Sequence, residues 1–99
     1  MILHVTTTAA WNTALRAGFY QTGSLQDEGF IHCCLPRQLQ GVLERYYSAI
    51  DHLLVLGIDE HKLTSPVVFE LSPVVSELFP HVYGVINLDA VQTIEPPDR

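Results

Sequence analysis

The amino-acid sequence predicts an α+β domain in which two early helices pack on a mixed, largely antiparallel β-sheet. First, 99 residues are enough for one domain with one core. Second, apolar residues recur at helical spacing in residues 11–18 and 39–48 and with a period of two from residue 52. Third, the last predicted strands are joined by short turns, which disfavours a doubly wound parallel sheet because parallel strands need long crossovers.

The chain begins with a strand and a helix. Residues 2–6 are interpreted as a strand, with the apolar Leu3 and Val5 on one face and Ile2, His4 and Thr6 on the other. A helix then runs to about Ala17, because Thr7 or Thr8 can cap its N-terminus and Gly18 is a natural stop.

A second strand and a second helix follow. Residues 19–26 form a polar and aromatic connection that has room for a short strand, and residues 29–34 read as a clear strand. Pro36 suits the first turn of a helix, and apolar residues then recur at helical spacing to about Ser48.

The second half of the chain is dominated by strands. Residues 78–84 are interpreted as a loop lined by aromatic and histidine side chains, and residues 95–99 as a frayed tail, so the predicted domain covers residues 1–94. The predicted strands are residues 52–58, 67–71, 85–88 and 90–94.

Charge and hydropathy limit the classes of partner that we expect for this chain. The net charge is −6, and the five Lys and Arg residues are scattered, so a nucleic-acid polymer is not expected as a partner. No apolar run approaches the roughly 18 residues that span a bilayer, and the N-terminal residues lack a basic segment. We therefore expect a cytoplasmic domain that binds a small molecule and no membrane. The oligomeric state is left open.

Cys33 and Cys34 are adjacent and are the only cysteines. Adjacent residues of a strand point to opposite faces, and neither a disulfide framework nor a Cys-x-x-Cys zinc motif is present. The favoured interpretation is two small, partly buried, reduced residues, and a reactive or metal-binding thiol is the alternative.

Three histidines inside apolar segments are the main functional signal. The usual signatures of P-loop nucleotide hydrolysis, serine hydrolases and zinc proteases are absent. His4, His32 and His81 are accompanied by hydroxyl or aromatic residues. Each could be a satisfied core or edge histidine, or the three could share a cleft. His52 and His61 lie in polar surroundings and are expected to be solvated.

Other polar residues carry weaker signals. Glu70 lies inside a predicted strand and either faces solvent or points into a polar cleft. Glu28 and Asp89 are interpreted as surface charges. Tyr20 and Ser24 lie in a glycine-containing connection, where they could reach a ligand or serve packing and the turn.

Several of these pieces resemble the family catalogued as domain of unknown function 952 over residues 1–91. The pieces are Ile2-Leu3-His4-x-Thr6, Trp11, Gly18-x-Tyr20, Ser24-Leu25-x-x-Glu28-Gly29-Phe30-Ile31-His32-Cys33 and Phe79-Pro80-His81-Val82-Tyr83-Gly84.

The chain also has a remote resemblance to the ADP-ribosyltransferase fold, in particular its RNA 2′-phosphotransferase branch. That resemblance implies a split sheet whose cleft binds NAD, and NAD-dependent transferase chemistry if the protein is an enzyme. His4 would bond a ribose hydroxyl of NAD. Thr6 would support that strand, Tyr20 would pack the nicotinamide, and His32 would match the histidine of the phosphotransferase branch.

The resulting site prediction has a catalytic and a cofactor-binding part. The catalytic set is His4, His32 and Glu70, and the cofactor-binding set is His4, Thr6, Tyr20, Ser24, His81 and Tyr83. Two alternatives stay open. One is a non-catalytic module with a degenerate cleft that binds a small molecule or a protein. The other, a metal site built from His4, His32, Cys34 and His81, is disfavoured because no local ligand spacing supports it.

Overall fold

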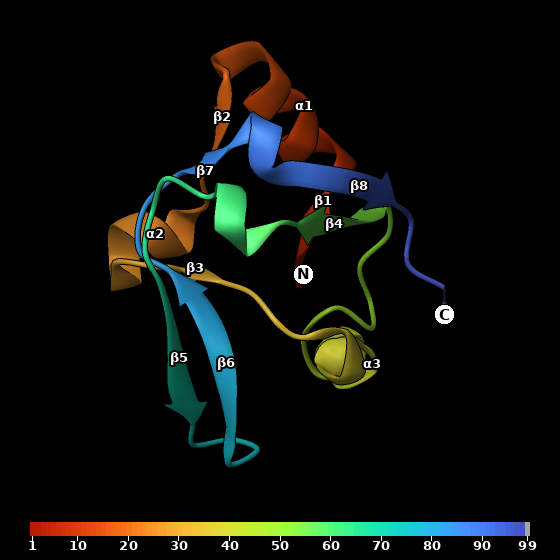
Figure 1. The fold of residues 1–99 in the computed structure, drawn as a ribbon. Helices are drawn as coiled ribbons and strands as arrows, with labels where there is room; N and C mark the ends of the chain where they lie inside the picture. Colours follow the sequence, from red (N-terminus) through yellow and green to blue (C-terminus); the bar gives the residue numbers. More distant parts are fainter. Residues whose placement is uncertain (99) are drawn as a thin grey trace.

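The first strand organises the largest sheet of the molecule. In the computed structural model, which describes residues 1–98, β1 (Ile2–Thr7) pairs antiparallel with β4 (Leu53–Ile58). On its other edge, β4 pairs antiparallel with β8 (Val91–Glu95), so the sheet has the order β1-β4-β8 (Figure 1). This order places strands from both ends of the chain on either side of one central strand.

A second sheet forms an arm beside the first. Its order is β3-β6-β5, in which β3 (Ile31–His32) and β5 (Val67–Ser72) flank β6 (Glu77–Val82), and both pairings are antiparallel. A smaller sheet pairs β2 (Phe19–Tyr20) with β7 (Ile86–Asn87).

A single β-bridge connects β1 to the end of the β3 segment. The amide of Leu3 donates to the carbonyl of Cys34 at 2.7 Å, and the amide of Cys34 donates back at 2.8 Å. The amide of Cys33 donates in the opposite direction, to the carbonyl of Pro80 in β6, at 3.1 Å. The backbone of these two cysteines therefore ties β1 to the arm.

Local sequence explains the ends of the first two helices. The hydroxyl of Thr7 accepts a hydrogen bond from the amide of Ala10 at 3.1 Å, which caps α1 (Thr8–Ala17). Gly18 ends that helix in the left-handed conformation, with φ +88°, and Gly29 does the same for α2 (Gly23–Glu28), with φ +89°. The remaining helices are α3 (Leu39–Tyr46) and the 3₁₀ turns η1 (Pro36–Gln38), η2 (Glu60–Lys62) and η3 (Leu88–Ala90).

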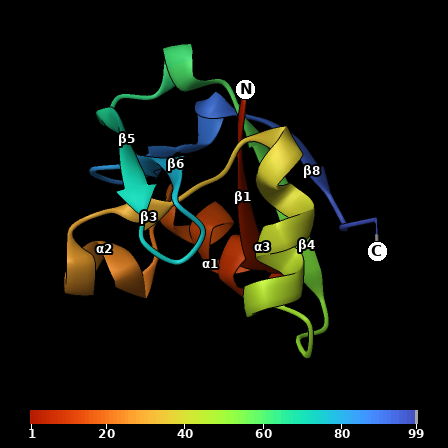
Figure 2. The ribbon, with the colours of Figure 1, turned by 90° about the horizontal axis from the view of Figure 1, so that it is seen from below.

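The core is divided by the two faces of β1. Ile2 packs with Trp11, Leu56 and other buried residues of the main apolar cluster. Val5 points the other way and packs with Leu43 of α3 and with Leu53. Figure 2 shows α3 lying across β1 and β4 on this second face.

The α+β class is confirmed, and the strand and helix at the start of the chain have nearly the predicted bounds. The loop expected at residues 78–84 is wrong, because residues 77–82 form β6, the middle strand of the arm. The helix α2 was not expected, so the structure has three α-helices rather than two early ones. The strand expected at residues 29–34 shortens to residues 31–32, because Gly29 still belongs to the end of α2.

Two further observations concern the termini and membranes. Residues 96–98 of the predicted tail have no regular structure, and Arg99 lies outside the described residues. None of the helices within residues 1–98 is long and apolar enough to cross a membrane.

The two glycines of α2 offer a matched test of this fold. Gly29→Ala should lower the free energy of unfolding by about 1–2 kcal/mol, because alanine is strained in the left-handed conformation at this position. Gly23→Ala adds the same methyl group to open space without that penalty, so its stability should be unchanged or up to about 1 kcal/mol higher. Urea denaturation of both variants measures this difference, and equal stabilities would contradict the left-handed turn.

Candidate functional site

His4 lies in a buried hydrogen-bond network behind β1. Its Nδ1 lies 2.6 Å from the main-chain oxygen of His32, and its Nε2 lies 2.7 Å from the hydroxyl of Tyr20. A carbonyl can only accept, so in the neutral ring Nδ1 carries the proton and Nε2 accepts from Tyr20. The hydroxyl of Tyr20 also lies 2.8 Å from that of Thr6, which completes the network.

Burial sets the charge state of this network. The side chain of His4 is 5% exposed, and removal from water lowers its pKa to about 4, with a smaller opposing contribution from the bond to the His32 carbonyl. Burial likewise raises the pKa of Tyr20 to about 12. Both groups are therefore neutral at physiological pH, and both nitrogens of His4 are occupied by the protein itself.

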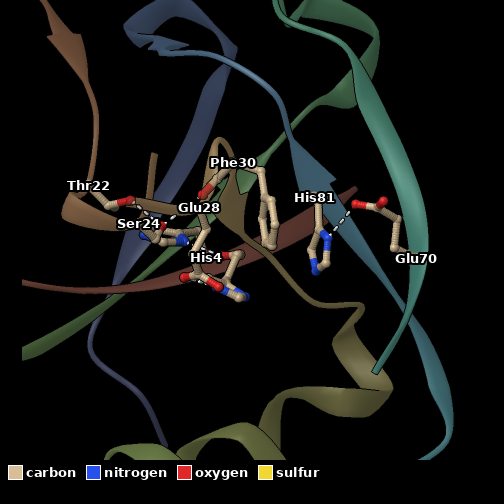
Figure 3. Close-up of polar contacts among 8 residues, drawn as sticks. His4, Thr22, Ser24, Glu28, Phe30, Glu70 and His81 are labelled. Carbon is tan, nitrogen blue, oxygen red and sulfur yellow. Dashed lines mark hydrogen bonds and ion pairs between the residues drawn. The ribbon is translucent and has the colours of Figure 1, made fainter. Parts of the chain in front are cut away.

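A second polar cluster lies on the arm. The antiparallel register places His32 of β3 directly opposite His81 of β6, and their ring centroids lie 5.3 Å apart. The ring of Phe30 stacks on that of His81 at 3.9 Å with an interplanar angle of 11° (Figure 3). It also meets the ring of His32 edge-on at 4.8 Å. One phenyl ring thus holds both imidazoles in place.

Each of these imidazoles is hydrogen-bonded to a carboxylate. Nδ1 of His81 lies 2.7 Å from Oε1 of Glu70, and we call these two residues the inner pair. Nε2 of His32 lies 3.0 Å from Oε2 of Glu28, and we call these the outer pair. The names follow exposure, since the side chain of His81 is 13% exposed and that of His32 is 55% exposed.

The inner pair includes a third member. The hydroxyl of Tyr83 donates to the same Oε1 of Glu70 at 2.5 Å. The hydrogen bonds from Tyr83 and His81 lower the pKa of Glu70, and donation to this carboxylate raises the pKa of Tyr83. Glu70 is therefore ionised at neutral pH and can only accept.

These partners fix which nitrogen of each neutral ring is available. His81 must donate from Nδ1 to Glu70, which leaves the lone pair on Nε2, and His32 donates from Nε2 to Glu28, which leaves Nδ1. Neither of the remaining nitrogens has a hydrogen-bond partner within residues 1–98. Figure 3 shows the second nitrogen of His81 pointing away from Glu70. Two oriented bases therefore lie side by side.

A cavity of about 560 Å³ opens beside these bases. Its walls come from β1, from α3 and from the hairpin that joins β5 to β6, and the buried Cys34 is one of its lining residues. His32, His81, Glu28 and Phe30 line its polar part, and no lysine or arginine is among the described residues that line it. Most of the other lining residues are apolar or aromatic: Leu3, Val5, Val42, Tyr46, Tyr47, Leu71, Pro73, Val74 and Phe79.

The predicted site residues separate into groups. His32, Glu70, His81 and Tyr83 come together on the arm. His4, Thr6 and Tyr20 come together behind β1, outside the lining of the cavity. Their roles toward a cofactor stay predictions.

Ser24 has a place of its own. Its hydroxyl is hydrogen-bonded to that of Thr22 at 2.6 Å and donates to the carbonyl of Phe30 at 2.8 Å. It therefore braces the turn between α2 and β3, and its predicted role toward a cofactor also stays a prediction.

Sequence reasoning did not select Glu28 and Phe30. Glu28 is exposed, as a surface charge should be, and its spacing of four residues from His32 could have indicated the outer pair. Asp89 is hydrogen-bonded to the side chain of Asn87. His52 and His61 are exposed, as expected.

Neither cysteine thiol is activated as a nucleophile. Cys33 and Cys34 are both unpaired and buried, and burial raises the pKa of Cys34 to about 11 and that of Cys33 still more.

Within residues 1–98, no three His, Cys, Asp or Glu side chains are arranged to hold a metal ion.

Comparison with known proteins gives a family and a fold. The family model described as "Protein of unknown function (DUF952)" matches residues 5–94. The crystal structure of Protein CC0527 from Caulobacter crescentus superposes with a TM-score of 0.85 at 22% identity, covering 94% of this chain and 82% of that chain. A double mutant of the same protein gives a TM-score of 0.84 at 21% identity, with the same coverage. A search of curated proteins found no match.

The buried imidazole makes stability depend on pH. Because the folded pKa of His4 is about 4 and the ordinary value is 6.5, only the unfolded chain binds this proton between those values. The free energy of unfolding should fall by about 3 kcal/mol from this group as the pH falls through that window, and level off below it.

Urea denaturation at several pH values measures this loss. His4→Gln should remove that share of the acid sensitivity, whereas His61→Gln, at an exposed position, should keep it. An NMR titration of the wild-type histidines is an independent measurement. Protonation of His4 above pH 6 would contradict the assignment.

Proposed function

The chain belongs to the DUF952 family, and we propose that it is an enzyme that performs general acid–base catalysis on a small molecule bound in the cavity between α3 and the arm. The observation that carries this proposal is the inner pair. An ionised carboxylate holds His81 with its free Nε2 at the lining of an apolar cavity.

The inner pair has the parts of an oriented base. Glu70 fixes the tautomer of His81 and stabilises the imidazolium that forms when Nε2 takes a proton. Tyr83 and the stacked ring of Phe30 hold the carboxylate and the imidazole in that arrangement. A base positioned in this way contributes typically about 10²–10⁴-fold to a rate.

The outer pair supplies a second proton-transfer group. His32 lies close enough to His81 for one bound molecule to reach both rings. Once protonated, it can return a proton to another atom of the substrate while His81 acts as the base. Such a pair suits reactions in which a proton leaves one position and arrives at another, including hydrolysis, elimination and tautomerisation.

The cavity sets the size and character of the substrate. Its volume lies within the usual range of about 300–1,000 Å³ for small-molecule sites. Its apolar walls would bury the body of the substrate, and the polar atoms would meet the two imidazoles.

NAD and an ADP-ribosyltransferase-like fold stay predictions from the sequence. The likeness to Protein CC0527, at 22% identity, supports the fold and no cofactor. NAD is among the first compounds to titrate, together with small aromatic molecules. The non-catalytic alternative keeps the same cavity, so it differs from this proposal only in turnover.

The ring opening of 5-nitrobenzisoxazole tests for catalysis, because this small neutral aromatic molecule reacts when one base removes one proton. We expect the protein to exceed free imidazole at equal concentration. His81→Ala should lower kcat/KM by about 10²-fold or more, and Glu70→Gln by less, because the ring keeps its nitrogen but loses its ionised partner. His61→Ala is the control and should have no effect.

The outcome also separates an enzyme from a binding module. Equal rates for the wild type and His81→Ala would overturn the catalytic assignment. If the molecule still bound in the cavity, the non-catalytic alternative would then be favoured.

A further inference from the structure

We propose that the cavity selects aromatic molecules that carry a positive charge over neutral and anionic molecules of the same shape. This inference rests on the proposed function, because it names the ligand class of the same site. It follows from the charge of the polar part of the cavity and from the aromatic residues of its walls.

The polar part of the cavity is electronegative while its two imidazoles are neutral. Glu28 lines the cavity, and Glu70 lies directly behind His81. No lysine or arginine among the described residues lines the cavity, and the chain as a whole carries a net charge of −6. A bound cation is therefore attracted by Glu28 at the cavity wall and, at longer range, by Glu70, whereas an anion is repelled by the same charges with no lining cation to offset them.

Glu28 has an oxygen available for a ligand. It bonds to His32 through Oε2, and its Oε1 has no hydrogen-bond partner among residues 1–98. An ammonium group has only donors, so it suits this acceptor.

The walls add aromatic faces. Tyr46, Tyr47 and Phe79 line the cavity in addition to Phe30. Aromatic faces attract cations that come within about 6 Å of the ring centroid. The ring of Tyr46 already has such a neighbour, because the guanidinium carbon of Arg45 lies 5.6 Å from its centroid.

The positive charge of Arg45 opposes the binding of a cation in the cavity. Arg45 does not line the cavity, but its positive charge lies beside one wall and repels a bound cation. The selectivity for cations should therefore increase in Arg45→Gln, which removes this charge and keeps a side chain of similar reach.

The test uses three probes that share a phenylethyl group and differ in charge: 2-phenylethylamine, 2-phenylethanol and 3-phenylpropanoate. Binding to the full chain is measured at pH 8 by NMR chemical-shift titration, at low and at high salt. We expect the amine to bind best and the carboxylate worst, with at least a fivefold ratio of Kd between them. High salt should reduce that ratio.

Two variants localise the effect. Glu28→Gln should reduce the preference for the amine severalfold. Glu95→Gln removes the same charge from the end of β8, away from the cavity lining, and should leave the preference unchanged.

Each outcome separates this inference from the function on which it rests. Equal affinities for the three probes, or tightest binding of the carboxylate, would overturn the charge selection and leave the ligand site standing. Binding of none of the probes would overturn the ligand site itself.

Discussion

The hydrogen bond from the ring of His4 to the main-chain oxygen of His32 joins the core of this protein to its candidate site. The ring of His4 is buried beside β1, where water is excluded, and the main-chain oxygen of His32 belongs to the short strand β3 of the arm. With the bridge between Leu3 and Cys34, it fixes the position of β3 relative to the large sheet. The register of β3 with β6 then places the two imidazoles opposite one another.

The two carboxylate–histidine pairs are alike in chemistry and different in surroundings. The inner pair is shielded by Phe30 and supported by Tyr83, whereas the outer pair is exposed and stands on the last residue of a short helix. This difference suits a proposed base and a proposed acid. The shielded imidazole of His81 keeps its geometry, while the exposed imidazole of His32 can exchange protons with water.

The sequence predicted the parts of this fold whose signals are local. Alternation identified β1 and β4, and a capping threonine with a terminal glycine bounded α1. Pro80 concealed β6, because proline cannot donate to a ladder and normally argues against a central strand. The six residues of α2 are too few to show helical periodicity. The inner pair depends on the register of β5 with β6, so the loop interpretation also hid the contact between Glu70 and His81.

Position 32 serves the architecture through its backbone and the chemistry through its side chain. The carbonyl holds His4, while the imidazole, more than half exposed, belongs to the cavity. Any amino acid other than proline presents the same carbonyl in an extended strand without a change of backbone. A change of side chain at position 32 would therefore alter the lining of the cavity and leave the hydrogen bond that positions His4 in place.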